Sequence, residues 1–322
     1  MLAADTLSSG TVRGGGTNEP DHDVRSRRRS VAIGAFDATT DRWNDVKGGG
    51  AVRRDELSLA TYNIWFDAYF AEQRYRAIAD VLARKMPDVM VFQEVTPSAL
   101  TVLLGQTWVR EHYLRAAVTG PAFGNYGMLM LTRIPPRWVT YTRLPTRLGR
   151  GFLRAEFIVN DRPLVVTALH LESGKAGVQL RATQLGNVFR SLDRVDSAVV
   201  LGDFNMRDDE NPRLDAAYTD LWPALHPDDA GYTEDTAINL MRLDSRNKQR
   251  QVRFDRVLLK SDGWTGVDIE LLGTEPISTE QPRVFPSDHF GVWSRLEARV
   301  PAPEQALKRP PRLRLMRRTP RG

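Results

Sequence analysis

The sequence predicts an α/β fold in which two packed β-sheets are flanked by helices. Apolar runs of strand length recur between residues 57 and 296, and only a few segments show the apolar period of an amphipathic helix. Many strands with a few helices between them are typical of two sheets packed face to face with helices outside. Polar residues able to carry chemistry follow several of these apolar runs, which places them at strand ends.

The composition is that of a soluble globular protein with a sizeable core. Of the 322 residues, 41% are hydrophobic and 26% are charged. There is no cysteine, so disulfides, zinc–thiolate sites and cysteine nucleophiles are excluded. No apolar run approaches the roughly 18 residues of a membrane span, and residues 1–16 lack the basic and apolar regions of a secretory signal. We therefore expect a cytoplasmic protein without a membrane span.

Composition divides the chain into three parts. Residues 1–54 are rich in Gly, Ser, Thr, Asp and Arg and show no apolar period, so we expect them to be mostly disordered. Residues 301–322 combine prolines with arginines and are expected to form a disordered basic tail. The folded domain is predicted over residues 55–300.

The positive charge lies mainly outside the predicted domain. The whole chain has a net charge of +5. Residues 301–322 contain seven Lys/Arg and one Glu, a net charge of +6, whereas residues 55–300 contain 29 basic and 32 acidic side chains, a net charge of −3. A basic tail can contact phosphate backbones without reading sequence, with an affinity that falls steeply as salt rises. A solvated tail without a partner explains the same composition equally well.

Helices are expected in three segments of the domain. An apolar face that recurs every three to four residues predicts a helix over Ala71–Lys85, with Pro87 beyond its end. Thr96-Pro97 is a typical N-cap and first-turn pair for a second helix. Gln179–Leu192 has the pattern of a third.

Strands are expected between and after these helices. Asn160-Asp161-Arg162 separates two alternating runs and predicts a β-hairpin. The predicted strands are Leu57–Ile64, Asp88–Phe92, Tyr126–Thr132, Leu153–Val159, Pro163–Leu169, Ala198–Leu201, Val252–Lys260, Val267–Leu272 and Phe290–Leu296.

Polar residues gather at the ends of the predicted strands. Each alone has an ordinary structural explanation, because a carboxylate or Asn after a strand is usually a turn or cap residue and a lone His is usually structural. Their recurrence in order favours one shared site, since strand ends at one edge of stacked sheets converge. The residues are Asn63, Gln93, Glu94, His170, Glu172, Asp203, Asn205, Asp255, Asp288 and His289.

The same residues lie in motifs that resemble, in order, those of the endonuclease/exonuclease/phosphatase superfamily. The motifs are Thr61-Tyr-Asn-Ile64, Phe92-Gln-Glu-Val95, Leu169-His-Leu-Glu-Ser173, Gly202-Asp-Phe-Asn-Met-Arg-Asp208, Arg253-Phe-Asp-Arg256 and Pro286-Ser-Asp-His289. Within the superfamily, the sequence is most similar to the tyrosyl-DNA phosphodiesterase 2 family, which shares Gly-Asp-x-Asn-x-Arg-Asp, Tyr-Thr-x-Asp-Thr, Arg-Phe-Asp-Arg and Phe-Pro-Ser-Asp-His. The resemblance covers about residues 57–297. One such motif would be weak evidence, whereas the ordered set is strong.

The resemblance implies a four-layer α/β sandwich with two central mixed β-sheets. It also implies a metal-dependent phosphodiesterase, with nucleic acid as the expected partner. Hydrolysis of a phosphate ester requires charge neutralisation on the phosphoryl oxygens, an oriented water molecule and a protonated group near the leaving oxygen. Oxygen ligands without thiols favour Mg²⁺ or Mn²⁺, held by one or two carboxylates together with water and substrate phosphate.

The resemblance also implies which residues bind metal and substrate. Glu94 corresponds to the main metal ligand. Asn63 lies beside it and contacts a metal-bound water or the phosphate. Asp288 is a further candidate metal carboxylate, and Arg207 would contact a substrate phosphate.

The remaining matched residues correspond to the catalytic group. Asp203 resembles the residue that orients or deprotonates the attacking water, and Asn205 would hold that water or a phosphoryl oxygen. His289 would stabilise the charge that develops on phosphorus, with Asp255 fixing its tautomer. His170 would donate a hydrogen bond to the phosphate or to the leaving group.

Two positions depart from the tyrosyl-DNA phosphodiesterase 2 pattern. Trp65 stands where those enzymes have Asp, and Asp67 follows two residues later. Glu234 stands where they have a Trp that helps to frame the tyrosyl group, and a carboxylate cannot form that cation–π contact, although it can pair with Arg207. The hydrolase residues are retained, but specificity for a tyrosyl adduct does not follow.

Three classes of function remain open from the sequence. The first is a nuclease or 5′-end-processing phosphodiesterase. The second is a phosphoesterase of the same superfamily that acts on small molecules or lipid head groups. The third is a non-catalytic binding module, which the retention of the full polar set argues against.

Overall fold

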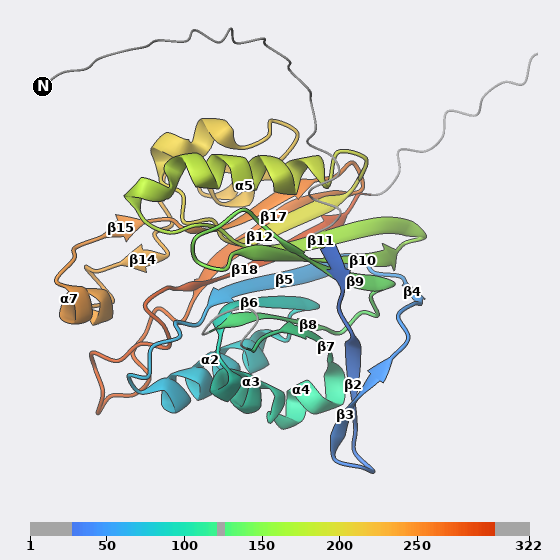
Figure 1. Ribbon diagram of the computed structural model, residues 1–322, viewed down its shortest axis with the longest axis horizontal. Coiled ribbons are helices and arrows are strands. Elements are labelled where there is room, and N and C mark those ends of the chain that lie inside the picture. Colours follow the sequence, from blue (N-terminus) through green and yellow to red (C-terminus); the bar gives the residue numbers. More distant parts are fainter. Residues whose placement is uncertain (1–27, 121–125, 300–322) are drawn as a thin grey trace, which may run out of the picture.

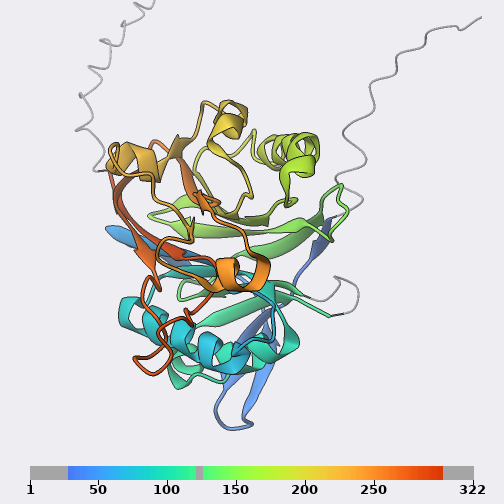
Figure 2. The same cartoon turned by 90° about the vertical axis from the view of Figure 1, so that its left-hand side faces the viewer.

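The computed structural model describes residues 28–120 and 126–299. Two β-sheets pack face to face in the middle of the molecule (Figure 1). Helix α5 (Val178–Arg190) covers the outer face of one sheet, and α2 (Ala71–Lys85), α3 (Pro97–Leu104) and α4 (Thr107–His112) cover the other. The view turned by 90° shows the same order of layers (Figure 2). The predicted four-layer α/β sandwich is confirmed.

The first sheet is mixed and has the strand order β1-β9-β10-β11-β12-β16-β13, with β4 paired to β10. Parallel pairing of β11 with β12 sets His170 opposite Asp203, and antiparallel pairing of β12 with β16 sets Asp203 opposite Asp255. The strands are β1 (Arg28–Ser30), β4 (Ala51–Val52), β9 (Trp138–Arg143), β10 (Gly151–Val159), β11 (Arg162–His170), β12 (Ala198–Asp203), β13 (Thr219–Asp220) and β16 (Asp255–Lys260).

The second sheet has the order β17-β18-β5-β6-β8-β7-β2-β3. β5 and β6 are parallel, so Asn63 and Glu94 leave the sheet at the same edge. β18 runs antiparallel to β5, so the chain enters it at that edge. The strands are β2 (Ile33–Asp37), β3 (Arg42–Val46), β5 (Glu56–Asn63), β6 (Val89–Val95), β7 (Leu114–Val118), β8 (Gly127–Thr132), β17 (Trp264–Leu272) and β18 (Gly291–Ala298).

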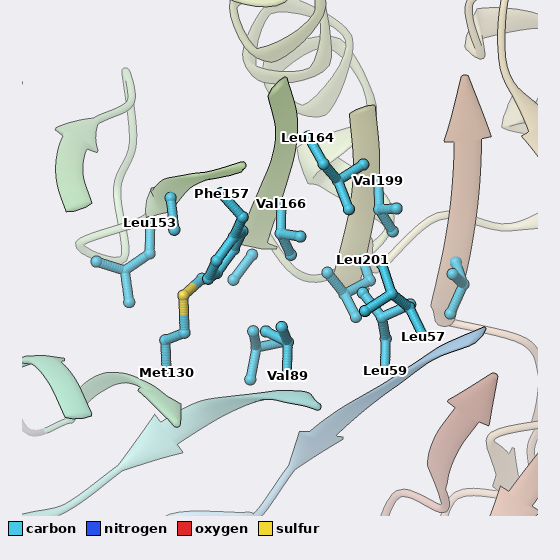
Figure 3. Close-up of a cluster of buried hydrophobic side chains, with 14 of the residues drawn as sticks. Leu57, Leu59, Val89, Met130, Leu153, Phe157, Leu164, Val166, Val199 and Leu201 are labelled. Carbon is cyan, nitrogen blue, oxygen red and sulfur yellow. The ribbon is translucent and has the colours of Figure 1, made fainter. Parts of the chain in front are cut away.

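The core between the sheets follows from the two-residue period of the strands. Leu57 and Leu59 of β5 meet Val199 and Leu201 of β12 in the buried layer shown in Figure 3. The alternate residue Val200 points outward and packs with the layer beneath α5. Each such buried side chain contributes about 1.5–3 kcal/mol of burial free energy, so the packed sheets form a rigid support for residues at their edges.

The predicted helices form where expected. α2 has the predicted bounds and ends where Met86 adopts a left-handed conformation, with φ of 45°. Thr96 caps α3, because its side chain accepts a hydrogen bond from the backbone N–H of Ala99 at 3.1 Å. Shorter elements complete the chain: α6 (Leu221–Leu225), α7 (Met241–Arg246), the 3₁₀ turns η2 (Lys175–Gly177) and η3 (Asp208–Arg213), and the small ribbon β14 (Glu234–Asp235) with β15 (Gln251–Val252).

The predicted hairpin is also present between β10 and β11. Asn160 and Asp161 have φ of 52° and 62°, which is the backbone of a two-residue type I′ turn. Val159 pairs with Arg162 on either side of this turn. The turn fixes the register that brings the end of β11 to the site.

The prediction that residues 28–54 are disordered is wrong, because these residues form β1 to β4. β2 pairs with β3 and reaches β7, while β1 pairs with β9 and β4 with β10. These strands are short and mostly exposed, so they lack the apolar alternation on which the prediction relied. Backbone pairing and the Phe36–Trp43 ring contact at 5.6 Å hold them instead. The folded part therefore begins by residue 28.

Two expectations fall outside the described residues. The disorder expected at residues 1–27 and in the tail at 301–322 concerns segments beyond the described ranges.

Among the helices of residues 28–120 and 126–299, none has the length and apolar character needed to cross a membrane.

Candidate active site

The polar residues predicted from the strand ends come together at one edge of the two sheets. Asn63 of the second sheet reaches across to Asp203 of the first, with its Nδ2 donating to Oδ2 at 3.0 Å. Ser287, just before β18, donates from its hydroxyl to the carbonyl oxygen of Asn63 at 2.7 Å. These bonds tie the ends of β5, β12 and β18 to one another.

Asp203 is the centre of this group. Its Oδ2 accepts hydrogen bonds from Asn63 and from Asn205 Nδ2, the latter at 2.9 Å, and its Oδ1 accepts from the backbone N–H of Asn205 at 2.8 Å. Burial raises the pKa of Asp203, but His170, His289 and Arg150 together outweigh burial and hold that pKa well below its usual range. Asp203 is therefore ionised at neutral pH.

The backbone around Asp203 is shaped by two left-handed residues. Gly202 has φ of 141°, and a Cβ there would lie 2.1 Å from the carbonyl oxygen of Leu169, so only glycine fits. Asn205 has φ of 51°, a conformation that Asn tolerates better than most residues. The Gly-Asp-Phe-Asn sequence thus places Asp203 and the Asn205 side chain in contact.

His170 lies between a guanidinium and carboxylates. Arg150 Nη1 lies 2.9 Å from His170 Nδ1 and donates to the hydroxyl of Tyr126 at 2.9 Å. Because a guanidinium can only donate, Nδ1 accepts and the proton of His170 is on Nε2. Nε2 lies 3.3 Å from Asp203 Oδ2 and 3.9 Å from Glu94 Oε1. Within the described residues this N–H faces Asp203 but makes no well-aligned hydrogen bond, so it can turn to a ligand.

His289 has a carboxylate partner instead. Its Nδ1 lies 2.8 Å from Asp255 Oδ2, and the Asp255 backbone is fixed by Thr233 Oγ1, which accepts its N–H at 3.1 Å. Burial lowers the pKa of His289, but the charges of Asp255, Asp288 and Asp203 raise that pKa well above its usual value. Burial raises the pKa of the Asp255 carboxyl to about 6. The pair therefore keeps a proton on His289 at neutral pH.

Glu94 projects from a β-bulge. The register between β6 and β8 shifts between Gln93 and Val95, and Glu94 has φ of 62°. Its Oε2 accepts a hydrogen bond from the backbone N–H of Phe66 at 3.1 Å. The bulge turns this carboxylate away from the strand and toward the polar group, with a side chain 12% exposed.

The residues around Glu94 fit a divalent cation. Burial raises the pKa of Glu94 to about 7, and the negative charge of Asp288 adds to this effect. A cation beside these carboxylates would stabilise their ionised forms. The described residues contain no cluster of three or more acidic or histidine side chains in a metal-binding arrangement. One or two carboxylates with water and phosphate are, however, the usual ligands of Mg²⁺.

Asp288 already has a partner. Its Oδ2 lies 3.0 Å from Arg242 Nη2, and its Oδ1 lies 3.4 Å from the hydroxyl of Ser287. Arg242 also donates from Nε to Glu234 Oε1 at 3.0 Å. Asp288 thus links Arg242 and Glu234 to the site. Of the two carboxylates Glu94 and Asp288, Glu94 is the one whose oxygens have fewer protein partners.

Glu234 does not pair with Arg207, contrary to the expectation from the sequence. Its two oxygens accept hydrogen bonds from Arg242 Nε at 3.0 Å and from Arg250 Nη1 at 2.9 Å. The Arg207 guanidinium instead lies over the ring of Phe254, 5.7 Å from its centroid. The segment between β14 and β15 supplies both arginines, Arg242 from helix α7 and Arg250 from the residues just before β15, and its course could not be predicted from the sequence.

Trp65 and Asp67, at the other position that departs from the tyrosyl-DNA phosphodiesterase 2 pattern, have structural roles. Trp65 is buried with Met241, Phe285 and Phe290 and does not contribute a polar group to the site. Asp67 accepts a hydrogen bond from the backbone N–H of Tyr69 at 2.9 Å, as part of a local turn. The carboxylate that the resemblance places at residue 65 is therefore not replaced by Asp67.

Glu172 and Gln93 are also structural. Glu172 Oε2 accepts a hydrogen bond from the Thr146 hydroxyl at 2.7 Å and so fixes the loop before β10. Gln93 exchanges hydrogen bonds with the Thr61 hydroxyl inside the second sheet.

Sequence reasoning missed Arg150, Tyr126 and Phe66. The Tyr126 ring stacks on His170 at 6.1 Å between centroids and contacts the Phe66 ring at 4.8 Å. Phe66 is 41% exposed although its backbone binds Glu94. The one signal in the sequence was the glycine on each side of Arg150, which indicates a close approach of the backbone but names no partner.

Comparison with known proteins agrees with this arrangement. A model of the endonuclease/exonuclease/phosphatase family matches residues 60–289, more than half of the chain. The chain belongs to the endonuclease/exonuclease/phosphatase family. The matched range begins in β5 and ends at His289, so it contains all the strand ends that form the site.

Tyrosyl-DNA phosphodiesterase 2 proteins are among the individual members of this family that the chain is similar to. Human tyrosyl-DNA phosphodiesterase 2 is 28% identical over 277 residues, which cover 81% of this chain and 74% of the human protein. The solved structure of tyrosyl-DNA phosphodiesterase 2 from D. rerio, complexed with a single-strand DNA product, is 25% identical, with a TM-score of 0.69 over 76% of this chain and 100% of the other. An endonuclease/exonuclease/phosphatase from Beutenbergia cavernae shares the fold at 24% identity, with a TM-score of 0.53 over 76% of this chain and 72% of the other.

Proposed function

We propose that this protein is a metal-dependent phosphodiesterase that hydrolyses phosphoester bonds in nucleic acid. The observation that carries the proposal is the convergence on one edge of the Asp203 carboxylate, the His170 ring beside it and the His289 ring paired with Asp255. An anionic acceptor, a neutral donor and a cation are the groups needed around a phosphoryl centre under attack by water. Relationship to a family of phosphoesterases supports this assignment.

Each group has a distinct task in the proposed reaction. Asp203 accepts a hydrogen bond from the attacking water, and Asn205 and Asn63 hold the carboxylate and the phosphate in place. The His289 cation stabilises the negative charge that grows on the phosphoryl oxygens, with Asp255 fixing its ring. His170 donates from Nε2 to a phosphoryl or leaving oxygen.

Glu94 is the residue that would hold Mg²⁺ or Mn²⁺, with Asn63 beside it and Asp288 as a further carboxylate anchored by Arg242. When bound, such a cation supplies charge neutralisation on the phosphoryl oxygens. The protein supplies a fixed carboxylate for it, because the bulge and the Phe66 backbone set the direction of the Glu94 side chain.

An exposed aromatic ring supports nucleic acid over a small phosphoester as the substrate. Phe66 lies beside Glu94, and together with Tyr126 it forms a pair of rings that continues to His170. Nucleobases stack on such side chains, with about 1–3 kcal/mol per base. The D. rerio relative was solved with a single-strand DNA product, which agrees with this choice.

A turnover panel tests the proposal. It compares single- and double-stranded oligonucleotides, a 5′-phosphotyrosyl oligonucleotide and bis(p-nitrophenyl) phosphate, each with Mg²⁺, Mn²⁺ or EDTA. We expect metal-dependent cleavage of oligonucleotides, no activity in Glu94→Gln, and full activity in the exposed control Glu111→Gln. Absence of hydrolysis with either metal, or full activity of Glu94→Gln, would contradict the assignment.

The aromatic pair allows a second readout in the same panel. Phe66→Ala should raise KM for oligonucleotides about 5- to 100-fold, the range of one lost base stack. It should leave hydrolysis of a dialkyl phosphodiester, added to the panel, unchanged, because that substrate has no aromatic ring to stack on Phe66. Equal losses on both substrates would favour a small phosphoester as the natural substrate.

A further inference from the structure

Two arginines lie beside the same aromatic ring next to the site. The Cζ atoms of Arg207 and Arg250 lie 5.7 Å and 5.8 Å from the centroid of Phe254. The Phe254 ring in turn lies 6.0 Å from the ring of His289. Both guanidiniums are therefore close to the proposed reaction centre, on the side of His289 rather than of His170.

Arg250 is fixed in this position by a buried carboxylate. Glu234 is 1% exposed and accepts a hydrogen bond from Arg250 Nη1 at 2.9 Å. The other Glu234 oxygen is bound by Arg242, whose Nη2 lies 3.0 Å from Asp288. The backbone of Arg250 is held as well, since Thr236 exchanges hydrogen bonds with both its N–H and its carbonyl oxygen at 2.8 Å. Glu234 is thus a positioning residue for the Arg250 guanidinium.

Arg207 carries positive charge without a paired carboxylate. Within residues 28–120 and 126–299 its guanidinium makes no salt bridge, and Arg181 binds both oxygens of the neighbouring Glu210, at 2.9 and 2.7 Å. Burial lowers the pKa of Arg207, the positive charges of Arg250 and Arg181 lower it further, and the nearby carboxylates of Glu210 and Asp209 offset only part of this effect. An anion placed beside Arg207 and Arg250 would relieve this repulsion.

We propose that Arg207 and Arg250 bind a second phosphate group of the substrate, next to the scissile phosphate on the His289 side. Guanidinium groups match phosphate oxygens with two parallel hydrogen bonds, and a nucleic-acid strand supplies a phosphate at every nucleotide. The inference rests on the proposed function and refines it. The substrate is a strand that continues past the scissile bond on this side, and Glu234 contributes to specificity through Arg250.

A charge scan along the substrate tests this subsite. Single phosphates of a short oligonucleotide substrate are replaced in turn by neutral methylphosphonate, and kcat and KM are measured for the wild type, Arg250→Gln and Glu234→Gln. Arg246→Gln is the matched control, because Arg246 is an exposed arginine of the neighbouring helix α7. For the wild type we expect one position beside the scissile bond to raise KM about 10- to 100-fold, the range of a charge-assisted hydrogen bond.

The variants should respond selectively at that position. Arg250→Gln should show the same 10- to 100-fold rise in KM on the fully charged substrate and no further rise when that one phosphate is neutral. Glu234→Gln should show a smaller loss at the same position, and Arg246→Gln should behave as the wild type. These results would support a phosphate subsite positioned through Glu234.

Other results would overturn it. If Arg250→Gln remains as sensitive as the wild type to every neutral position, Arg250 binds no substrate phosphate. If an abasic nucleotide at that position raises KM and the methylphosphonate does not, the ring and arginines bind a base instead. Both results require cleavage by the wild type, whereas failure of the proposed function would appear as no metal-dependent cleavage of any substrate.

Discussion

His170 and His289 are equally buried, each 4% exposed, yet their surroundings give them opposite charges. Burial and then the positive charge of Arg150 lower the pKa of His170 to about 4. Burial also lowers the pKa of His289, but the negative charges around it, Asp255 first among them, raise that pKa well above its usual value. The comparison teaches that the hydrogen-bond partner on Nδ1, and not the depth of burial, decides whether a histidine of this site is a neutral donor or a cation.

The two partners come from different kinds of structure. Asp255 begins β16, which pairs with β12, so its position follows from the sheet register. Arg150 lies just before β10, in a loop where the Thr146 hydroxyl accepts a hydrogen bond from the Arg150 backbone N–H and donates one to Glu172. The cation is thus built on the rigid sheet, while the neutral donor depends on a loop.

The largest expected effect comes from making the same substitution at both histidines. His289→Gln removes a cation and should lower kcat about 10²–10⁴-fold, the range for acid–base groups. His170→Gln keeps an N–H donor and should lower kcat about tenfold or less, the cost of one imperfect neutral hydrogen bond. Steady-state kinetics on an oligonucleotide measures both. Equal losses would show that the two histidines do not differ in charge as the partners indicate.

The next effect concerns the partner of His289. Asp255→Asn keeps the side-chain shape but removes the charge that holds the proton on His289, so we expect a loss in kcat of about 10²-fold. Asp262→Asn, an exposed carboxylate in the turn before β17, is the control. Thermal unfolding of both variants separates loss of chemistry from loss of fold. A loss within about twofold would remove Asp255 from the proposed pair.

These contrasts also show which parts of the site the sequence could predict. Glu94, Asp203, Asp255 and His289 were placed together correctly because each adjoins a strand whose apolar run and polar end are both visible in the sequence. The fold was predictable for the same reason, since apolar residues recur at regular intervals along the buried strands and on one face of α2. The contact between Asp255 and His289 was implied by the family resemblance, and the structure forms it where the chain enters β16 and β18.

Contacts made by loops and edge strands were not predictable in this way. Arg150 meets His170 through a loop with no periodicity. Glu234 pairs with Arg250, at the end of the segment between β14 and β15 that contains α7, and not with Arg207. Residues 28–54 were missed because backbone pairing, not an apolar pattern, holds them. Side-chain partners that depend on the course of a loop leave no spacing in the sequence.

A smaller effect is expected from the partner of His170. Arg150→Met frees Nδ1, so the imidazole can exchange between its two neutral tautomers, and kcat/KM should fall about three- to tenfold. Long-range ¹H–¹⁵N NMR of the metal-free protein should show His170 with the proton on Nε2 in the wild type and a mixture in the variant. Arg147→Met, an exposed arginine in the same loop, is the control. A wild-type protein with the proton on Nδ1 would contradict the assignment.

The smallest effect on turnover is expected from removing residues 301–322, which lie outside the described residues. The segment carries a net charge of +6, and each phosphate that a basic side chain neutralises contributes about −0.7 to −0.9 to the slope of log affinity against log salt. If the tail contacts nucleic acid, the truncated protein should bind an oligonucleotide more weakly at low salt and with a slope shallower by at least about 1, with kcat unchanged. The ratio of kcat between His170→Gln and His289→Gln should also be the same in the full-length and truncated proteins, because neither histidine depends on the tail for its partner. An unchanged slope would show that the tail is a solvated extension. A changed ratio would show that the tail acts on the site itself. In that case Arg150 and Asp255 alone would not determine the charges of the two histidines.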